Sequence, residues 1–564
     1  MGYLQILKNH TNPSLSAPSE STLPLLPLQN ANGFTSAEDG WERTPDTASR
    51  RTPTRLLRSR ARCAAIAAGI GVILVCAGIL IPGAIRPTSA PPPTSPPHTT
   101  QSPSAAAQAA VDALYARQST TLEQASARYS LRTDRPPPPN YDRWFDFARE
   151  KSCLIDEYDR VHRDFKPFYQ LARRDPRIFQ DMIDRATRVL DSEQVGIGRV
   201  EIRDGEVELS MSGYSAYADW QDNWRHFSSG LPNMTFLINS HDEPRVAFNY
   251  REPSALQRAL SKSQPPTDPK PFQIRPLPGT SKFFAEQSGC NVPMEASGFM
   301  KTANNDSGFL IATAEPGPGY TTDLYPMLSM TKVSPCFADI LYPTMYYYQR
   351  SWWSGKFAHP DDVPWEGKKG QLYWRGMSNG GMIIDSNYHH YARFKLIDIG
   401  RAHPALMDVA ITLFAETLCG EGCNRTAIME EYNITKEGQP RENLYNYKYA
   451  MDVDGTTFSG RFLGLLRSGS LVFKSTIFEE YFNDWIRPYE HYIPVLPDLS
   501  DLVEKIEWAN ANPEEAHSIQ LRGAEVARRV MTDDQNDCYY FAVLLEWAQL
   551  QSYARNIEGA AGQR

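Results

Sequence analysis

The sequence lacks a basic stripe interleaved with aromatic residues, and its net charge of −8 is mildly acidic. Proteins that bind nucleic acid present such a stripe to the phosphate backbone, so we expect no nucleic-acid partner. The chain also lacks internal repeats. Apolar periodicity is missing from residues 1–62, which are rich in Ser, Thr, Pro and Asn, and we interpret them as a disordered tail.

One long apolar run is present at residues 63–85, which carry no charge and are about long enough to cross a bilayer. The run lies too far from the N-terminus for a cleaved signal peptide, so we interpret it as a signal anchor. Six arginines precede it from Arg50 to Arg62, whereas only Arg86 follows closely. The positive-inside rule therefore predicts a type II membrane protein with a cytosolic tail. A wholly buried helix is the alternative.

Residues 86–139 are dominated by Pro, Ser and Thr, a composition that cannot bury a core. We expect a lumenal stalk here, with transient helix at most in the Ala-rich part at 105–128. Aromatic and apolar content rises from Tyr141, and a body large enough for catalysis continues to about Leu550. Anchor, stalk and large lumenal body are typical of enzymes of the secretory pathway, and we expect a Golgi membrane or another membrane of that pathway.

Six cysteines lie in the predicted lumenal body, an even number that allows up to three disulfides in an oxidising compartment. They are Cys153, Cys290, Cys336, Cys419, Cys423 and Cys538. Their connectivity cannot be deduced, although the spacing of Cys419 and Cys423 suits a local bridge. A zinc site competes, but no second ligand pair accompanies this CxxxC. Sequons permit N-glycans at Asn233, Asn305, Asn424 and Asn433.

Strand and helix patterns alternate through the body, which favours α/β units with parallel sheets. Strands are expected at 207–214, 235–239, 371–374, 449–453 and 470–473. Helices are expected at 178–190, from 501, from Asn512 with Pro513 in its first turn, and at about 538–552.

The loop after the strand at 235–239 is a candidate catalytic site. It carries His241, Asp242 and Glu243 in succession. In open α/β sheets, ligands bind beyond the carboxyl ends of strands, so a carboxylate there is well placed for acid–base chemistry. A solvated acidic loop is the alternative for an isolated Asp–Glu pair.

The segment at 445–475 is a candidate phosphate site, because it reads as strand, Gly-containing loop, helix, Gly turn and strand. Its loop offers the hydroxyls of Thr456, Thr457 and Ser459, a close backbone approach at Gly460 and the guanidinium of Arg461. We expect Arg461 in the first turn of the helix, whose N-terminus suits a phosphate. An ordinary turn with a surface arginine is the alternative.

Two further segments are less specific. Residues 371–382 form a strand that ends in Arg375-Gly376 and a Gly-rich loop, and Arg393 follows. These features fit a second anion-facing loop. The aromatic run at 339–353 could stack on a sugar ring, but core packing is the favoured interpretation.

Together these motifs resemble glycosyltransferase family 90, which includes Rumi-type protein O-glucosyltransferases and fungal capsule-associated xylosyltransferases. The resemblance covers about residues 141–550 and is strongest in `KYAMDVDGTTFSGRF`, `GSLVFK`, `HYIPVLPDLSDL` and `IEWANAN`. `YDRWFDFARE`, `CLIDEYDRVHRD` and `NSHDEPR` are more similar to the fungal branch.

The resemblance implies a GT-B-like α/β fold, in which two Rossmann-like domains face a cleft, and inverting transfer from a UDP-sugar. We expect an acceptor-side domain at 140–365, a UDP-sugar-binding domain at 366–535 and a final helix and tail at 536–564 that pack back on the first domain. The predicted activity is transfer of xylose to a glycan or glycoprotein acceptor. Transfer of glucose to protein Ser is one alternative, and a catalytically silent glycan-binding or scaffold protein is another.

The resemblance also implies roles for individual residues. Asp242 matches the catalytic base, and the stretch that cradles the diphosphate matches Thr456, Thr457, Phe458, Ser459, Gly460 and Arg461. Arg375 and Gly376 match the other donor-side loop, in which Met377 stands where the family often has Ser, and Arg393 stands in for a later Arg. A Cys153–Cys538 link is implied. No cofactor or metal is expected, although Asp452 and Asp454 spell the DxD that holds Mn²⁺ in GT-A enzymes.

Overall fold

The computed structural model describes residues 102–190, 197–211, 218–246, 248–249, 324–334, 337–350, 363–381, 383–435 and 439–562. The predicted tail and signal anchor lie outside these residues, as do Cys290, Asn305 and Cys336. Within the described ranges, no helix has the length and apolar character needed to cross a bilayer.

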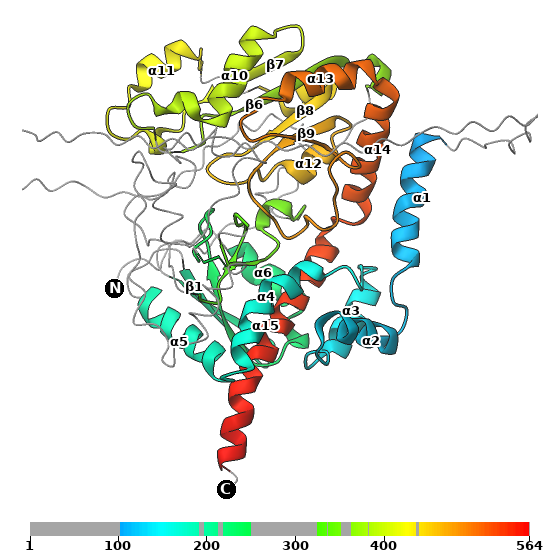
Figure 1. Ribbon diagram of the computed structural model, residues 1–564, viewed down its shortest axis with the longest axis vertical. Coiled ribbons are helices and arrows are strands. Elements are labelled where there is room, and N and C mark those ends of the chain that lie inside the picture. Colours follow the sequence, from blue (N-terminus) through cyan, green and yellow to red (C-terminus); the bar gives the residue numbers. More distant parts are fainter. Residues whose placement is uncertain are drawn as a thin grey trace, which may run out of the picture. The chain divides into compact units, whose positions relative to one another are not determined.

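Two helices occupy the region predicted to be the end of the stalk, which corrects that prediction. They are α1 (Pro103–Ala116) and α2 (Leu122–Thr133). Helix α1 packs along α14 (Pro513–Arg529), as Figure 1 shows. Tyr115 donates from Oη to the Arg529 carbonyl over 2.8 Å. The Pro-rich average composition had hidden an apolar face at Val111 and Tyr115 that meets this neighbour.

The first sheet has the strand order β2-β1-β3-β4-β5. Its strands are β1 (Ile197–Arg203), β2 (Glu206–Met211), β3 (Met234–Asn239), β4 (Leu328–Ser329) and β5 (Ile340–Leu341). Strand β1 is antiparallel to both β2 and β3, whereas β3, β4 and β5 are parallel. The sheet is therefore mixed, and only its β3–β5 part has the parallel arrangement expected of a Rossmann-like domain. Asp204 and Gly205, both with positive φ, form the tight β1–β2 turn.

Helices from both ends of the chain pack with the first sheet in one hydrophobic core. They are α3 (Tyr141–Glu150), α4 (Asp159–Ala172), α5 (Ile178–Leu190), α6 (Ala218–Arg225) and α15 (Asp533–Gly562). Helix α15 packs against α3, α4 and α5. The structure has a disulfide between Cys153, which follows α3, and Cys538 of α15.

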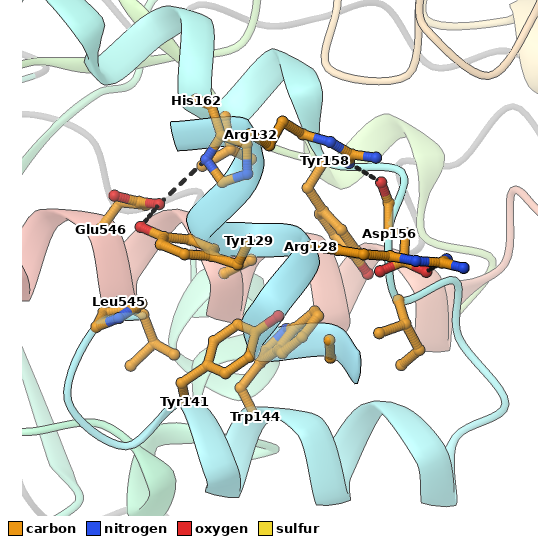
Figure 2. A pocket seen from close by; sticks show the side chains of 15 residues that line it. Arg128, Tyr129, Arg132, Tyr141, Trp144, Asp156, Tyr158, His162, Leu545 and Glu546 are labelled. Carbon is orange, nitrogen blue, oxygen red and sulfur yellow. Dashed lines mark hydrogen bonds and ion pairs between the residues drawn. The ribbon is translucent and has the colours of Figure 1, made fainter. Parts of the chain in front are cut away.

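The carboxylate of Glu546 on α15 anchors this arrangement (Figure 2). Tyr129 of α2 donates to it over 2.6 Å, and Nδ1 of His162 on α4 lies 3.1 Å away. Burial favours the neutral acid, but the hydrogen bond and charge of His162, with the charge of Arg135, lower the pKa of Glu546 to about 2. The ionised carboxylate therefore ties three helices together beside a cavity lined by aromatic, aliphatic and charged side chains.

The second sheet is entirely parallel and has the order β10-β9-β8-β6-β7. Its strands are β6 (Lys369–Met377), β7 (Met407–Leu413), β8 (Tyr447–Val453), β9 (Leu471–Ser475) and β10 (Ile493–Val495). The expected strands at 371–374, 449–453 and 470–473 are thus confirmed. Two sheets, one mixed and one all-parallel, are consistent with a GT-B fold.

Side-chain alternation along β8 divides the core of the second sheet. Tyr449, Met451 and Val453 pack with α10 (Ala392–Ala402) and α13 (Leu502–Ala511), whereas Ala450 packs with α12 (Phe462–Leu466). Figure 1 shows these helices around β6, β8 and β9. Helix α14 begins with Pro513 after an Asn512 N-cap, as the sequence predicted. Helix α11 (Arg425–Glu431) follows a second disulfide, between Cys419 and Cys423.

Short 3₁₀ helices complete the described elements. They are η1 (Ser228–Gly230), η3 (Met345–Tyr347), η4 (Trp365–Gly367), η5 (Asn387–His390), η6 (Glu416–Leu418) and η7 (Arg441–Asn446). Asn233, Asn424 and Asn433 are exposed and thus accessible to glycosylation.

Candidate active site

The second sheet has a topological switch point between β6 and β8, because the chain runs from β6 outward to β7 and then returns to the other side of β6. Ligands of open parallel sheets bind beyond the carboxyl ends of the strands at such a point. Two segments meet there. One is residues 375–381, the end of β6 and the loop that follows it, and the other is residues 454–461 after β8, which we call the donor loop. Arg393 joins them, because its Nε donates to the Asp454 carbonyl over 3.0 Å and its Nη1 to the Met377 carbonyl over 2.9 Å.

Two guanidinium groups lie together at this point. The side chains of Arg393 and Arg461 sit 5.6 and 5.8 Å from the Trp374 ring centroid. Burial, and then the charge of Arg461, lower the pKa of Arg393 to about 9, and burial also lowers the pKa of Arg461. Within the described part of the chain, neither guanidinium forms an ion pair with a carboxylate. The pair is therefore poised to receive an anion.

Several buried polar atoms around the two arginines have no hydrogen-bond partner among the described residues. The potential donors are Trp374 Nε1, Thr457 Oγ1, Ser459 Oγ and Arg461 Nη2, and the acceptors are Asn379 Oδ1 and Asp454 Oδ1. Buried polar groups are normally satisfied, because leaving one unpaired costs about 1–3 kcal/mol. Their concentration at the switch point indicates a site for a ligand that carries both an anion and hydroxyl or N–H groups.

Glycines give the two loops their close packing. A Cβ on Gly455 would lie 2.7 Å from Nη2 of Arg393, and one on Gly460 would lie 2.9 Å from Cγ of Tyr346. A Cβ on Gly376 would lie 2.5 Å from the Trp374 ring. Gly376 and Gly460, both predicted site residues, therefore allow aromatic side chains to lie against the loops.

The source of positive charge differs from the sequence-based prediction. Arg461 is the N-cap residue of α12, and this helix has only five residues. The macrodipole of so short a helix is weak, so the attraction for an anion comes mainly from Arg393 and Arg461.

Two predicted donor-site residues have their side chains engaged elsewhere. Arg375 pairs with Asp408 of β7 over 2.5 Å and donates to Gln439 over 2.9 Å. Phe458 is buried between the rings of Tyr346 and Tyr347, at centroid distances of 6.0 and 6.1 Å. At these two positions only the backbone is available to a ligand, because the side chains are engaged in contacts within the protein.

Both aspartates of the DxD sequence, Asp452 and Asp454, accept hydrogen bonds from other parts of the protein. Asp452 accepts from Nζ of Lys474 on β9 over 2.9 Å, and both side chains are buried. Asp454 accepts from the Ile477 backbone N–H over 3.0 Å, and burial raises the pKa of its carboxyl to about 7. A lysine thus occupies the position beside Asp452 that a metal would need.

Asp242 follows β3 in the first sheet, in the predicted loop. The loop is braced by Asn239, which donates to the Glu243 carbonyl over 2.6 Å and accepts from the His241 N–H over 3.0 Å. Asp242 is partly exposed, whereas Glu243 is 1% exposed. Burial, with the neighbouring charge of Glu243, raises the pKa of Asp242 to about 7, a value suited to a general base near neutral pH.

The aromatic run at 339–353 contacts the end of β3, where the loop of Asp242 begins, and the donor loop. Tyr342 Oη lies 3.5 Å from the Asn239 carbonyl oxygen, and Tyr347 Oη lies 3.1 Å from that of Ser459. Both tyrosines are buried, as is Tyr348, so the core interpretation of this run is confirmed for these three residues, whereas Gln349 and Arg350 are exposed. The sequence could not show that this core segment contacts the candidate base loop and the donor loop.

Comparison with known proteins finds a family match for part of the chain. Residues 338–563 match the model of glycosyl transferase family 90. The matched region contains the whole second sheet, both donor-side loops and α15. It agrees with the resemblance drawn from the sequence motifs.

Curated relatives are similar to parts of the chain. Protein O-glucosyltransferase 2 of Danio rerio is 34% identical over 193 residues, which are 33% of this chain and 34% of the relative. Protein O-glucosyltransferase 3 of Homo sapiens is 33% identical over 164 residues, 28% of this chain and 30% of the relative. Protein O-glucosyltransferase 1 of Rattus norvegicus is 27% identical over 260 residues, 42% of this chain and 60% of the relative. The first two alignments span about a third of the relatives' lengths.

Sequence reasoning missed Trp374, Asn379 and Lys474 in the region that matches the family 90 model. Trp374 lies in the strand that leads into the predicted Arg-Gly loop, but its pattern is that of a core residue. Lys474 lies on β9 next to β8, opposite Asp452. The sequence did contain a signal for Lys474, because a lysine inside an apolar strand is expected to be buried. A buried charge without a partner is costly, so an acidic partner could have been predicted.

Proposed function

We propose that this chain is an inverting glycosyltransferase that moves a sugar, preferably xylose, from a UDP-sugar to a glycan hydroxyl in the secretory pathway. The observation that carries the proposal is the pair of guanidiniums, Arg393 and Arg461, neither of which forms an ion pair with a carboxylate of the described residues. A diphosphate supplies the missing negative charge, and its oxygens accept from Thr457, Ser459 and Arg461 Nη2. The acceptors Asn379 Oδ1 and Asp454 Oδ1 suit hydroxyl or N–H groups of the nucleoside or sugar.

The proposed mechanism uses Asp242 as the base. The ionised carboxylate takes the proton of an acceptor hydroxyl while that oxygen attacks the anomeric carbon from the face opposite UDP. The new glycosidic bond forms as the bond to the diphosphate breaks, which inverts the configuration. Charge that develops on departing UDP is stabilised by Arg393 and Arg461.

The alternative acceptor is a protein serine, with glucose as the donated sugar. It is favoured by the names of the curated relatives, which are protein O-glucosyltransferases. The xylose proposal depends instead on `YDRWFDFARE`, `CLIDEYDRVHRD` and `NSHDEPR`, which resemble the fungal branch. Release of UDP from UDP-xylose and from UDP-glucose, each with glycan and Ser-peptide acceptors, distinguishes the two.

The decisive test of catalysis is Asp242→Asn. We expect transfer to fall by at least about 100-fold, because general bases contribute about 10²–10⁴-fold, while UDP affinity stays within about twofold. Asp222→Asn, at an exposed position on α6, serves as the matched control and should transfer normally. Normal turnover by the Asp242 variant would refute the assigned base. Binding of UDP by the wild type without transfer to any acceptor would instead favour the scaffold alternative.

A further inference from the structure

A buried chain of polar contacts runs beneath the donor loop. Glu480, which follows β9, is fully buried, and its Oε1 contacts the hydroxyl of Tyr347. The same hydroxyl lies 3.1 Å from the backbone carbonyl oxygen of Ser459 in the donor loop. Asn536 of α15 fixes the tyrosine from the other side by donating to its carbonyl over 3.1 Å.

The number of protons available decides which of the contacts between Glu480, Tyr347 and Ser459 are hydrogen bonds. A tyrosine hydroxyl carries one proton, and both of its partners here, a carboxyl oxygen and a carbonyl oxygen, are acceptors if Glu480 is ionised. Only one of the two contacts would then be a hydrogen bond. If Glu480 is protonated, it donates to Tyr347 Oη, and Tyr347 donates to Ser459. Both contacts of the Tyr347 hydroxyl are then hydrogen bonds.

The charges around Glu480 are compatible with the neutral acid. From β9, Lys474 lies 3.7 Å from Oε2, but it is closer to Asp452 of β8, at 2.9 Å. Asp452 and Asp454 disfavour a third negative charge, and the neighbouring hydroxyl of Tyr481 bonds to Asn536. Burial is the largest influence, and it raises the pKa of Glu480 to about 8 despite Lys474.

We propose that Glu480 and Tyr347 are positioning residues for the donor, in which the neutral Glu480 carboxyl holds the Tyr347 hydroxyl and that hydroxyl holds the donor loop at the Ser459 carbonyl. The inference rests on the proposed function, because it concerns the loop that would bind UDP. Ser459 Oγ and Arg461 Nη2 project from this stretch of backbone, so fixing the carbonyl fixes two proposed phosphate contacts. Loss of the Glu480 proton redirects the tyrosine proton and releases the loop.

The experiment is calorimetric titration of the protein with UDP from pH 6 to pH 8.5, a range that stays below the pKa of about 9 of Arg393, so that the change measured is that of Glu480. In the wild type, we expect the dissociation constant to rise by about two- to tenfold above pH 8, the worth of one hydrogen bond. In Glu480→Gln, the amide N–H donates to Tyr347 at every pH, so affinity at pH 7 should match the wild type and the rise above pH 8 should disappear. In Tyr347→Phe, we expect the dissociation constant for UDP to be about two- to tenfold higher than in the wild type at pH 7, and to stay high throughout the range.

Tyr539→Phe is the matched control, because this buried tyrosine has no hydroxyl partner among the described residues, and it should keep the wild-type profile. Melting temperatures of all variants separate loss of folding from loss of binding. A Glu480→Gln protein with the wild-type rise above pH 8, or a Tyr347→Phe protein with wild-type affinity at pH 7, overturns the positioning proposal. Absence of UDP binding by folded wild type at every pH overturns the donor site itself.

Discussion

Arg461 donates from Nη1 to the backbone carbonyl of Arg375 over 2.8 Å. This bond joins the donor loop after β8 to the end of β6, across the switch point of the second sheet. It fixes the plane of the guanidinium and leaves Nη2 buried without a partner among the described residues. The side chain is therefore oriented before any ligand arrives, which reduces the entropy cost of binding.

Replacement of Arg461 tests this orientation. Arg461→Lys keeps the charge but cannot both bond to the Arg375 carbonyl and present a second N–H in a fixed plane. We expect UDP affinity to fall by about 10- to 100-fold, because hydrogen bonds to charged groups contribute about 1.5–3 kcal/mol. Arg375→Ala should lower the melting temperature but change UDP affinity less, since its side chain pairs with Asp408. Equal UDP affinity in wild type and Arg461→Lys would contradict the proposed role of the Arg461 guanidinium in binding UDP.

The raised pKa of Asp242 predicts the pH dependence of transfer. A base acts when ionised, so kcat/KM should fall about tenfold per pH unit below pH 7, where Asp242 becomes protonated. Glu243→Gln removes a negative charge that raises this pKa, so the acidic limb should move to lower pH. Glu206→Gln, in the exposed β1–β2 hairpin, should leave it in place. Profiles between pH 5 and 9 that coincide for wild type and Glu243→Gln would exclude this coupling.

The Lys474–Asp452 ion pair predicts activity without a divalent metal. Transfer should be undiminished in EDTA, because the cations that face the leaving group are arginines. Lys474→Met leaves Asp452 buried without its ion-pair partner, and loss of one partner of a buried pair costs about 3–5 kcal/mol of stability. We expect this variant to melt at lower temperature, with no rescue by Mn²⁺. Activity lost in EDTA and restored by Mn²⁺ would point instead to a metal at the DxD.

The two disulfides should differ in their contribution to stability. Cys153–Cys538 joins residues 385 apart, whereas Cys419–Cys423 closes a span of four residues. Loop-closure entropy grows with span, and loss of a native disulfide from a small secreted domain costs about 2–5 kcal/mol. Serine replacement of the first pair should therefore lower the melting temperature more than replacement of the second. A reversed order in thermal unfolding would show that strain or unfolded-state structure dominates.

Local patterns predicted much of the second sheet. Val472 and Phe473 were identifiable from an apolar strand pattern, and α14 from Asn512 and Pro513. These signals are local, because capping and alternation act over a few residues. The donor loop was also predictable, since its hydroxyls, glycines and Arg461 are contiguous.

Contacts between distant segments were not predictable from such patterns. The antiparallel pairing of β1 with β3 depends on register across a long connection, and Lys474 meets Asp452 only once β8 and β9 are adjacent. The packing of α1 on α14 was missed because a Pro-rich neighbourhood masked its apolar face. Arg375 was assigned to the ligand from its motif, but its side-chain partner, Asp408, follows 33 positions later on another strand.

Helix α15 completes the core of a sheet whose five strands all precede it by well over a hundred positions. During synthesis, β1 to β5 therefore emerge long before Trp547 and Leu544 arrive to cover them. Cys153 likewise cannot form its disulfide with Cys538 until Cys538 has been translated. The core of the first sheet is therefore completed only after every strand of the second sheet has been synthesised, and until then its apolar face lacks the cover of α15.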